Sequence, residues 1–400
     1  MSIKLAHISD CHIGVGYPGP TPFARFQDIE KILDWTADKL IEEKVQIALI
    51  CGDCFKDAKV MLDRASQEIA SIVRFLRRLS DANITTIMIS GTPSHDAIPA
   101  YDLIDAMSIP RLIIWTKPGI NRLRNIACLP GLNRAALLTQ DEYKGLPPEQ
   151  VHRIMTYKIT QLCVGMAAQM PNDMPKILMA HMTYQGAETG FTDLLMQNEP
   201  ILTREAVSGF DLVCLGHIHK PQTIDGKVFY SGPVERLSFN EEDVTPGFWV
   251  YDIQMNDTGY KKQYLIQPQF IETPARRFVT RSFDNCIEAL EMHGASFFGS
   301  GFADDLKDAI VRIRYSCSEE VAKQLNRKEL EKALYQAGCF YVAEIKGEVQ
   351  RVDRVRDSQV TENLSVGQAL DRWCIQQDIE EDERQALGAM TAELLEGVQA

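Results

Sequence analysis

Short apolar runs alternate with amphipathic segments along the first two-thirds of the chain. Residues 3–8, 45–51 and 84–90 are rich in Ile, Leu and Val, which predicts buried strands. Between these runs, apolar residues recur at helical spacing over residues 29–41 and 69–79. This alternation predicts an α/β domain whose sheet is covered by helices on both faces.

More strands are expected downstream, in a more antiparallel arrangement, because no helical pattern separates the later ones. They are predicted at residues 176–180, 211–215, 228–231, 248–253 and 260–266. Pro268 and Pro274 bracket a stretch with little periodicity, which predicts a linker.

The pattern beyond this linker predicts a small α+β module. Strands are expected at residues 310–315 and 340–345, with a helix at 319–337 between them. A polar stretch follows, and helical spacing of apolar residues resumes at Val366 and continues to Leu395. We therefore expect three parts, at residues 1–270, 275–345 and 346–400.

The composition agrees with a globular protein. Of the 400 residues, 45% are apolar and 24% charged, which argues against disorder or a collagen-like repeat. A net charge of −13 disfavours nucleic-acid binding through overall charge, but not through metal ions and a local basic patch. The ten cysteines are mostly scattered singly. With no secretory leader and no apolar run of about 20 residues, we expect a cytoplasmic protein without membrane association.

Five of the eight histidines lie in short polar motifs directly after predicted strands. The motifs are Asp10-Cys11-His12, Gly52-Asp53, residues 91–96 with His95 and Asp96, His181, and Gly216-His217-Ile218-His219. The carboxyl ends of strands in an open α/β sheet converge on one crevice. Residues i and i+2 of an extended segment also point the same way. The motifs therefore predict one site that gathers carboxylates and imidazoles.

This donor set predicts a two-metal centre. Mixed carboxylate and imidazole ligands suit Mn²⁺, Fe or Zn²⁺ better than Mg²⁺, which prefers oxygen. Seven ligand-type residues exceed the need of one ion, and two ions about 3.5–4 Å apart can clamp both reacting oxygens in phosphoryl transfer. Each motif alone is more simply a turn or a hydrogen-bonded core residue. Their joint occurrence favours two divalent ions, most simply Mn²⁺, with Mg²⁺, Fe or Zn²⁺ as alternatives.

The order of these motifs resembles the calcineurin-like metallophosphoesterase superfamily. Within it, residues 216–222 and 230–239 resemble the nuclease subunit of SbcCD-type DNA double-strand-break repair complexes. The resemblance covers residues 1–270, and the module that follows is similar to the family's capping domain in position. It implies a four-layer fold of β-sheets flanked by helices, a small C-terminal α+β capping domain and a terminal helical segment.

The resemblance also implies roles for individual residues. The implied ligands are Asp10, His12 and His219 for the first metal and His181 and His217 for the second, with Asp53 bridging both. His95 would stabilise charge beside the scissile phosphate or protonate the leaving oxygen, and Asp96 would orient it. Ser94 stands where the family has an Asn ligand, in a loop two residues longer. We therefore expect weaker binding of the second metal, or a water in that position.

The leading hypothesis is a metal-dependent DNA exonuclease and endonuclease, the nuclease subunit of an SbcCD-like complex. The same metal motifs serve phosphoesterases for small phosphodiesters or phosphoproteins, which stay an alternative. The missing Asn keeps a third hypothesis open, a catalytically impaired scaffold that binds DNA or an ATPase.

The expected partners are DNA, an SbcC-like ATPase subunit and a second copy of the chain. Arg74, Arg77 and Arg78 share a helical face and are candidate DNA contacts, and Arg276 is another. The apolar stripe of the terminal helical region either packs on its own domain or docks the ATPase. The resemblance implies a homodimer.

Overall fold

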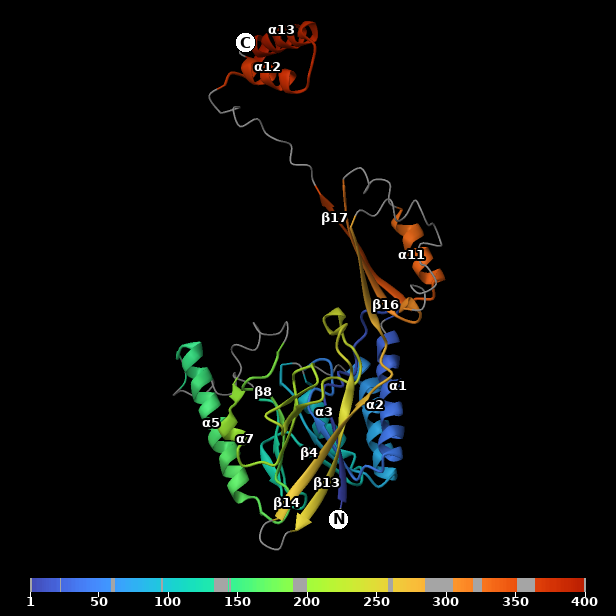
Figure 1. The fold of residues 1–400 in the computed structure, drawn as a ribbon, viewed down its shortest axis with the longest axis vertical. Coiled ribbons are helices and arrows are strands. Elements are labelled where there is room, and N and C mark those ends of the chain that lie inside the picture. The colour runs from blue at the N-terminus through green and yellow to red at the C-terminus, as the bar shows by residue number, and fades with distance from the viewer. Residues whose placement is uncertain are drawn as a thin grey trace. The chain divides into compact units, whose positions relative to one another are not determined.

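The computed structural model describes residues 2–21, 23–58, 62–94, 96–132, 143, 145–189, 200–257, 262–284, 305–318, 326–350 and 364–398. The chain divides into two units (Figure 1). The first comprises residues 1–315 and 325–347, and the second residues 316–324 and 348–400.

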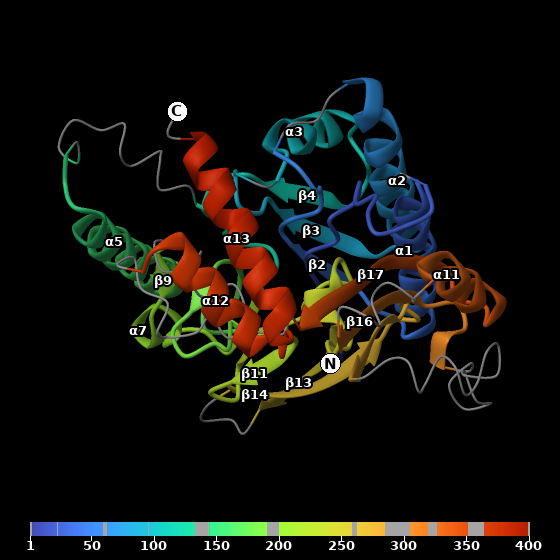
Figure 2. The ribbon, with the colours of Figure 1, turned by 90° about the horizontal axis from the view of Figure 1, so that it is seen from above.

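The first sheet has the order β14-β13-β1-β2-β3-β4. Its parallel strands are β1 (Ser2–Ile8), β2 (Ile47–Cys51), β3 (Thr85–Ile89) and β4 (Leu112–Trp115). β13 (Gly247–Asp257) pairs antiparallel with β1, and β14 (Lys262–Glu272) pairs antiparallel with β13. Helices α1 (Ala24–Glu42), α2 (Leu62–Asp81) and α3 (Ile98–Ala106) cover one face (Figure 2).

The second sheet has the order β11-β12-β10-β7-β6-β5. Its strands are β5 (Gly119–Asn121), β6 (Ile126–Leu129), β7 (Ile177–His181), β10 (Leu212–Gly216), β11 (Gln222–Ile224) and β12 (Val228–Tyr230). Helices α5 (Pro148–Gln169) and α7 (Arg204–Val207) pack on one face of it. The short strands β8 (Thr183–Tyr184) and β9 (Ile201–Leu202) pair beside this sheet.

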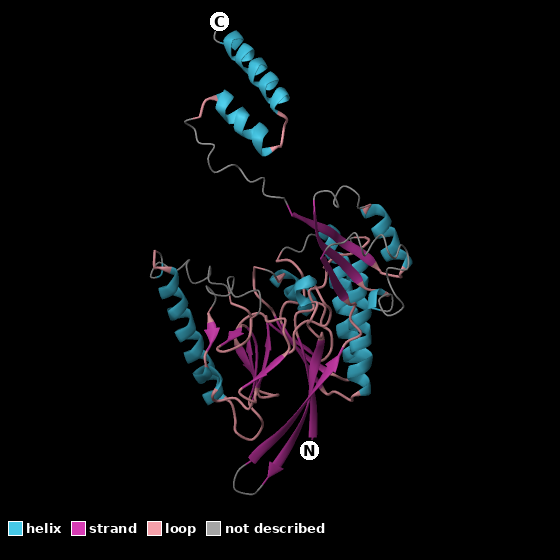
Figure 3. Ribbon diagram, turned by 45° about the horizontal axis from the view of Figure 1, so that its top comes forward, coloured by secondary structure: helices cyan, strands magenta, loops and turns pink. Residues whose placement is uncertain are grey.

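Side-chain alternation along the strands explains how the layers stack. In β2, Leu49 faces a core shared by the two sheets, while Ile50 faces the core under α1 and α2. In β10, Leu212 joins the same shared core and Val213 faces the core under α5. Because neighbouring side chains of a strand point to opposite faces, the sheets stack between two helical layers (Figure 3). This confirms the predicted α/β class with sheets flanked by helices.

The predicted linker at residues 268–274 is wrong in its first part. β14 continues through Pro268, which lies opposite Tyr251 of β13, and ends at Glu272. Since β14 is the edge strand of its sheet, a residue without an amide hydrogen is tolerated there. The strands β4, β5 and β6 and the helix α5 were not predicted at all.

The C-terminal third contains a small sheet and a helical hairpin. The sheet has the order β15-β16-β17, with strands at Phe278–Asp284, Ile310–Ser318 and Tyr341–Gln350, and α11 spans Arg327–Gln336. Residues 319–325 of the predicted helix lie outside the described residues. The terminal region forms two helices, α12 (Val366–Gln376) and α13 (Glu381–Val398). None of the helices in the described ranges is long and apolar enough to cross a membrane.

A buried ion-pair network joins α1 to the segments that follow β12 and β14. The guanidinium of Arg25 is fully buried and lies 2.6 Å from Asp28 and 3.3 Å from Glu235. Arg276 contacts Asp28 at 2.7 Å and Asp308 at 2.8 Å, and its guanidinium stacks over the Phe340 ring. Breaking such a buried pair costs about 3–5 kcal/mol, so the network fixes the start of the α+β module on α1.

His7 of β1 is a buried structural residue. Its Nε2 lies 3.1 Å from the Leu215 carbonyl oxygen and its Nδ1 lies 3.2 Å from the Tyr251 hydroxyl. A neutral ring satisfies both contacts, with Nε2–H donating and Nδ1 accepting. Burial therefore lowers the pKa of His7 to about 3.

We expect His7 to make stability depend on pH. The unfolded chain takes up a proton below pH 6.5, whereas the folded state resists until about pH 3, so protonation favours unfolding. The wild type should lose about 2 kcal/mol between pH 7.5 and pH 5 relative to His7→Gln. Urea unfolding of both proteins at the two pH values measures this difference. An equal loss in wild type and variant would contradict it.

Candidate metal centre

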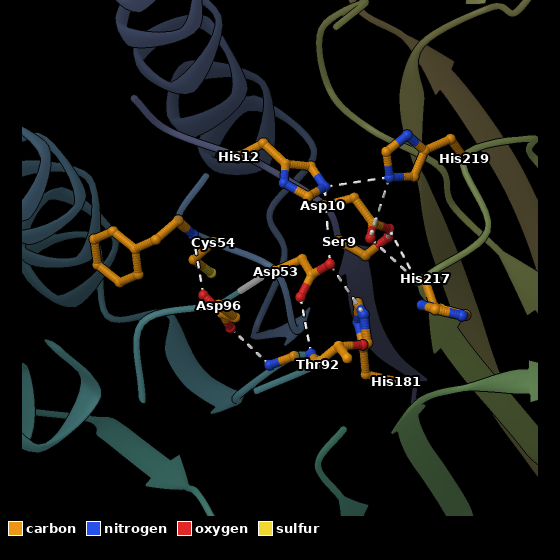
Figure 4. A network of polar contacts seen from close by, with 12 residues as sticks. Ser9, Asp10, His12, Asp53, Cys54, Thr92, Asp96, His181, His217 and His219 are labelled. Atoms are coloured by element: carbon orange, nitrogen blue, oxygen red, sulfur yellow. Dashed lines mark hydrogen bonds and ion pairs between the residues drawn. The ribbon is translucent and has the colours of Figure 1, made fainter. Parts of the chain in front are cut away.

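The polar motifs lie at the carboxyl ends of strands from both sheets (Figure 4). Asp10 and His12 follow β1, and Asp53 follows β2. His181 is the last residue of β7, and His219 follows β10. The structure brings these five side chains together at the carboxyl ends of these strands.

Two overlapping sets of side chains offer the donor atoms of a cation site. Donor atoms of Asp10, His12 and His219 all lie within 4.8 Å of one another, and so do those of Asp10, Asp53 and His181. The first set matches the ligands that the family resemblance implies for one metal. Each set combines residues from both sheets, with Asp10 common to the two.

The His181 ring presents a nitrogen lone pair to a carboxylate. Its Nδ1 lies 2.8 Å from the Cys51 carbonyl oxygen and donates to it. Its Nε2 is buried without a hydrogen-bond partner and lies 3.3 Å from Asp53 Oδ2. Burial alone would lower the pKa of His181, but the nearby Asp53 carboxylate raises it to about 10. The ring and the carboxylate therefore need a proton or a metal cation between them.

His12 and His219 meet in a similar way. Their Nε2 atoms are 3.2 Å apart, and His219 Nε2 lies 3.8 Å from Asp10 Oδ1. On its other side, His219 Nδ1 lies 2.7 Å from Glu241 Oε1. Burial lowers the pKa of His219, but its hydrogen bond with Glu241 raises it to about 9.

Glu241 is a site residue that sequence reasoning missed. It lies in the short helix η3 (Phe239–Glu241), is buried, and accepts a second hydrogen bond from the Leu237 amide at 2.7 Å. A carboxylate bonded to the outer nitrogen of a ligating imidazole fixes its tautomer and ring orientation. Since Glu241 lies 22 residues after His219, only the three-dimensional path of the chain reveals the contact.

The Asp53 carboxylate is held as an anion. Burial opposes its charge, but His181 and His12 beside it hold its pKa well below the ordinary value. Its Oδ1 also accepts a hydrogen bond from the Thr92 amide at 2.9 Å. Gly91 allows this close approach, because a Cβ there would lie 1.8 Å from Asp53 Oδ1.

Four of the motif residues have left-handed backbone conformations that non-glycine residues rarely adopt. Their φ angles are 53° at Asp10, 43° at His12, 48° at Asp53 and 95° at His217. Such strain costs of order 1–3 kcal/mol per residue and persists where the surrounding fold enforces it. The folded state therefore tolerates this strain, which lowers its stability, in order to direct these side chains toward the centre.

These observations fit divalent metal ions. Buried carboxylate oxygens and imidazole nitrogens converge here, and His181 Nε2 has no hydrogen-bond partner. Bound ions would supply Lewis-acid polarisation of a phosphoryl group and a more acidic water.

His217 is predicted as a ligand, but the structure puts its ring in neither donor set. Its backbone amide donates to Asp10 Oδ1 at 3.0 Å, and its ring packs edge-on against His181 with centroids 5.2 Å apart. Ser94 is exposed, and His95 lies outside the described residues. Their metal-binding and catalytic roles stay predictions.

Asp96 is buried beside the candidate centre and links the end of β3 to two other segments. Its carboxylate accepts hydrogen bonds from the Gly91 amide at 2.7 Å, the Phe55 amide at 3.2 Å and the Tyr101 hydroxyl at 2.5 Å. Burial, with the nearby Asp53 charge, raises the pKa of Asp96 to about 6.

Most of the candidate DNA-contacting arginines have acidic partners. Arg74 pairs with Glu30, and Arg78 pairs with Asp34 and Asp38. Arg77 is exposed on the same helix. These pairs offset the positive charge of the face, so DNA binding there stays a prediction with less support. Arg276 belongs to the buried ion-pair network, which makes it unsuitable as a surface contact.

A family model decides the identity of the domain. The model described as calcineurin-like phosphoesterase matches residues 3–221. The chain belongs to the calcineurin-like phosphoesterase family. Members of the family bind two divalent metals, and residues that could hold a metal are present in this phosphoesterase. Hydrolysis of phosphoesters with the help of metal is the activity that the family supports.

Two solved structures are similar to this phosphoesterase at low identity. One, titled a novel archaeal phosphodiesterase, is 8% identical with a TM-score of 0.28, and the match covers 66% of this chain and 100% of that one. The other, a dimetal phosphatase from Danio rerio, is 10% identical with a TM-score of 0.35, covering 68% and 97% respectively. With scores this low, neither bears on the substrate of this phosphoesterase.

We expect Glu241→Gln to weaken metal binding. The neutral amide removes the negative charge behind His219, so Mn²⁺ affinity should fall about 10- to 100-fold. Calorimetric titration of the full chain with Mn²⁺ measures this directly. Glu242→Gln is the matched control, because Glu242 bonds to Thr280 instead of a histidine. Equal affinities in the two variants would contradict the role of Glu241.

Proposed function

We propose that this phosphoesterase is a DNA nuclease with exonuclease and endonuclease activity, the nuclease subunit of an SbcCD-like repair complex in the cytoplasm. The supporting observation is the segment at residues 230–239, on which the nuclease resemblance rests. This segment leads directly into η3, where Glu241 holds the ring of His219. The segment that carries the resemblance therefore lies next to the candidate centre in the chain.

Each residue of the centre has a defined task in this proposal. When bound, divalent ions, most simply Mn²⁺, polarise the phosphodiester and acidify the attacking water. Asp10, His12, Asp53, His181 and His219 hold the ions, with His217 and Ser94 as further predicted ligands. His95 protonates the leaving oxygen, and Asp96 holds its loop through Gly91, Phe55 and Tyr101.

The exposed side chains of the α12–α13 hairpin support the proposal that this region binds another protein. Within its described side chains only Cys374 is buried. Large apolar side chains that a packed hairpin normally covers are exposed on both helices, namely Val366, Trp373, Ile375, Leu387, Met390, Leu394 and Leu395. Exposed apolar side chains in this number typically mark a docking site.

The ATPase subunit is the partner that we propose for this hairpin. Leu387, Met390 and Leu394 recur at helical spacing, which is the pattern that packs against the helices of a coiled coil. A dimer of phosphoesterase subunits would hold two such hairpins and two ATPases. The homodimer itself stays a prediction of the family resemblance.

We expect the purified chain with Mn²⁺ to degrade linear duplex DNA. His95→Ala should lower the rate by about 100-fold or more, because general acid catalysis contributes 10²–10⁴-fold. Metal content should stay unchanged in this variant. Gel analysis of end-labelled DNA and elemental analysis of the protein measure the two quantities, with His152→Ala as the control.

Two other results would contradict the nuclease. Cleavage of bis(p-nitrophenyl) phosphate without any cleavage of DNA would favour a small phosphodiester or phosphoprotein substrate. DNA binding with no turnover under Mn²⁺, Mg²⁺, Fe²⁺ or Zn²⁺ would favour a scaffold.

We expect a charge on the apolar surface of α13 to break the partner contact. Met390→Glu and Leu394→Glu should each weaken binding to an SbcC-like ATPase at least tenfold, since each buries a carboxylate in an apolar interface. Gln385→Glu adds the same charge at an exposed polar position of α13 and should bind normally. DNA cleavage by the isolated chain should be equal in all three variants. Calorimetry measures the affinity for the ATPase, and light scattering measures whether the chain is a dimer. Normal ATPase binding by Leu394→Glu would contradict docking through this surface.

A further inference from the structure

A cavity of about 680 Å³ opens beside the candidate metal centre. Gly14 and Lys56 line its inner end, two and three residues after His12 and Asp53. The two segments run side by side, since Ile13 and Phe55 form a β-bridge. The cavity is therefore lined by the same two chain segments that carry His12 and Asp53. Its volume is in the range of pockets that bind small organic groups.

Two aromatic rings at the cavity are exposed. Tyr17 is 66% exposed and Phe23 is 56% exposed, although both line the cavity wall. Phe26 lies below them, buried in the core under α1 and α2. A second cavity of about 460 Å³ shares Phe23, Phe26 and Gln67 and continues the groove along α1 and α2. Open ring faces of this kind suit a flat π-system.

The part of the cavity lined by α2 is polar. Gln67 offers amide donors and an acceptor, and Glu68 offers carboxylate oxygens. Glu68 packs against Gly14, where a Cβ would lie 2.4 Å from Glu68 Oε1 and where φ is +108°. Lys56 and Asp57 act on the Glu68 carboxylate with opposite charges, so positive charge is not in excess here. The groove therefore suits an uncharged flat group with hydrogen-bonding edges, not a second phosphate.

We propose that this cavity is a nucleoside subsite that receives the base and sugar next to the scissile phosphate. The inference rests on the proposed nuclease function, since it places the phosphodiester at the metal centre. A nucleobase matches both walls, because its faces stack on Tyr17 and Phe23 while its edge meets Gln67 and Glu68. Stacking recognises every base, so the subsite provides affinity for nucleic acid in a protein with a net charge of −13.

A binding experiment tests the subsite without catalysis. The probe is 2-aminopurine deoxyribonucleoside monophosphate, whose fluorescence is quenched when it stacks on an aromatic ring. The full chain without added metal should quench the probe saturably. Tyr17→Ala and Phe23→Ala should each raise the dissociation constant about tenfold, the effect of losing one stacking contact. Tyr17→Phe keeps a ring and should bind like the wild type.

Tyr157→Ala is the matched control for these variants. Tyr157 is 65% exposed, like Tyr17, but lies on α5, which packs on the second sheet. Its removal should leave the dissociation constant unchanged. Equal dissociation constants for the wild type, Tyr17→Ala and Phe23→Ala would overturn the subsite.

A cleavage experiment separates this inference from the nuclease proposal. Oligonucleotides with one abasic residue should be cut about tenfold less efficiently when the gap falls next to the scissile bond, and Tyr17→Ala should remove this penalty. If DNA is cut and the penalty is the same in Tyr17→Ala, the subsite is wrong and the nuclease stands. If the probe binds through Tyr17 and Phe23 but DNA is never cut, the nuclease fails and a site for a smaller nucleotide substrate remains.

Discussion

The buried Asp53 carboxylate is the constraint around which the candidate centre is organised. An isolated anion in an apolar interior is prohibitively unfavourable, so its charge must be met on every side. Here the Thr92 amide, the His181 ring and the His12 ring surround it, and the two rings hold its pKa low. The fold must deliver these groups from three different strand ends. This requirement explains why the polar motifs lie at the strand ends, next to the apolar core between the sheets.

The two sheets contribute unequally to this arrangement. The first supplies the carboxylates Asp10 and Asp53, and the second supplies His181 and His219. Both candidate donor sets therefore cross the core between the sheets, which is built from residues such as Leu49 and Leu212. That apolar core fixes the spacing of donors that repel or attract one another, and the left-handed residues at Asp10, His12 and Asp53 absorb the resulting strain.

The sequence allowed the central strands and most of the centre to be predicted, because both depend on local patterns. Runs such as residues 45–51 are continuously apolar, and each motif follows such a run directly. Helix α5 also has a local pattern, since its buried residues Val151, Met155, Ile159 and Cys163 repeat every fourth position. In contrast, β4 is a four-residue, half-buried edge strand, and its apolar run is shorter than those of the central strands. The contact of Glu241 with His219 depends on the path of the chain between them, which no local pattern encodes.

The crossing of the sheets by both donor sets links metal binding to the stability of the whole domain. A cation held by His12 and His219, or by Asp53 and His181, contacts residues of both sheets at once. Unfolding separates the sheets and therefore loses every such contact, so bound metal stabilises the folded state in proportion to the logarithm of its concentration. Without metal, the proton that the elevated pKa of His181 retains at neutral pH partly replaces this cross-link. Metal must displace that proton, so the same contact that stabilises the metal-free fold also sets the pH dependence of metal binding.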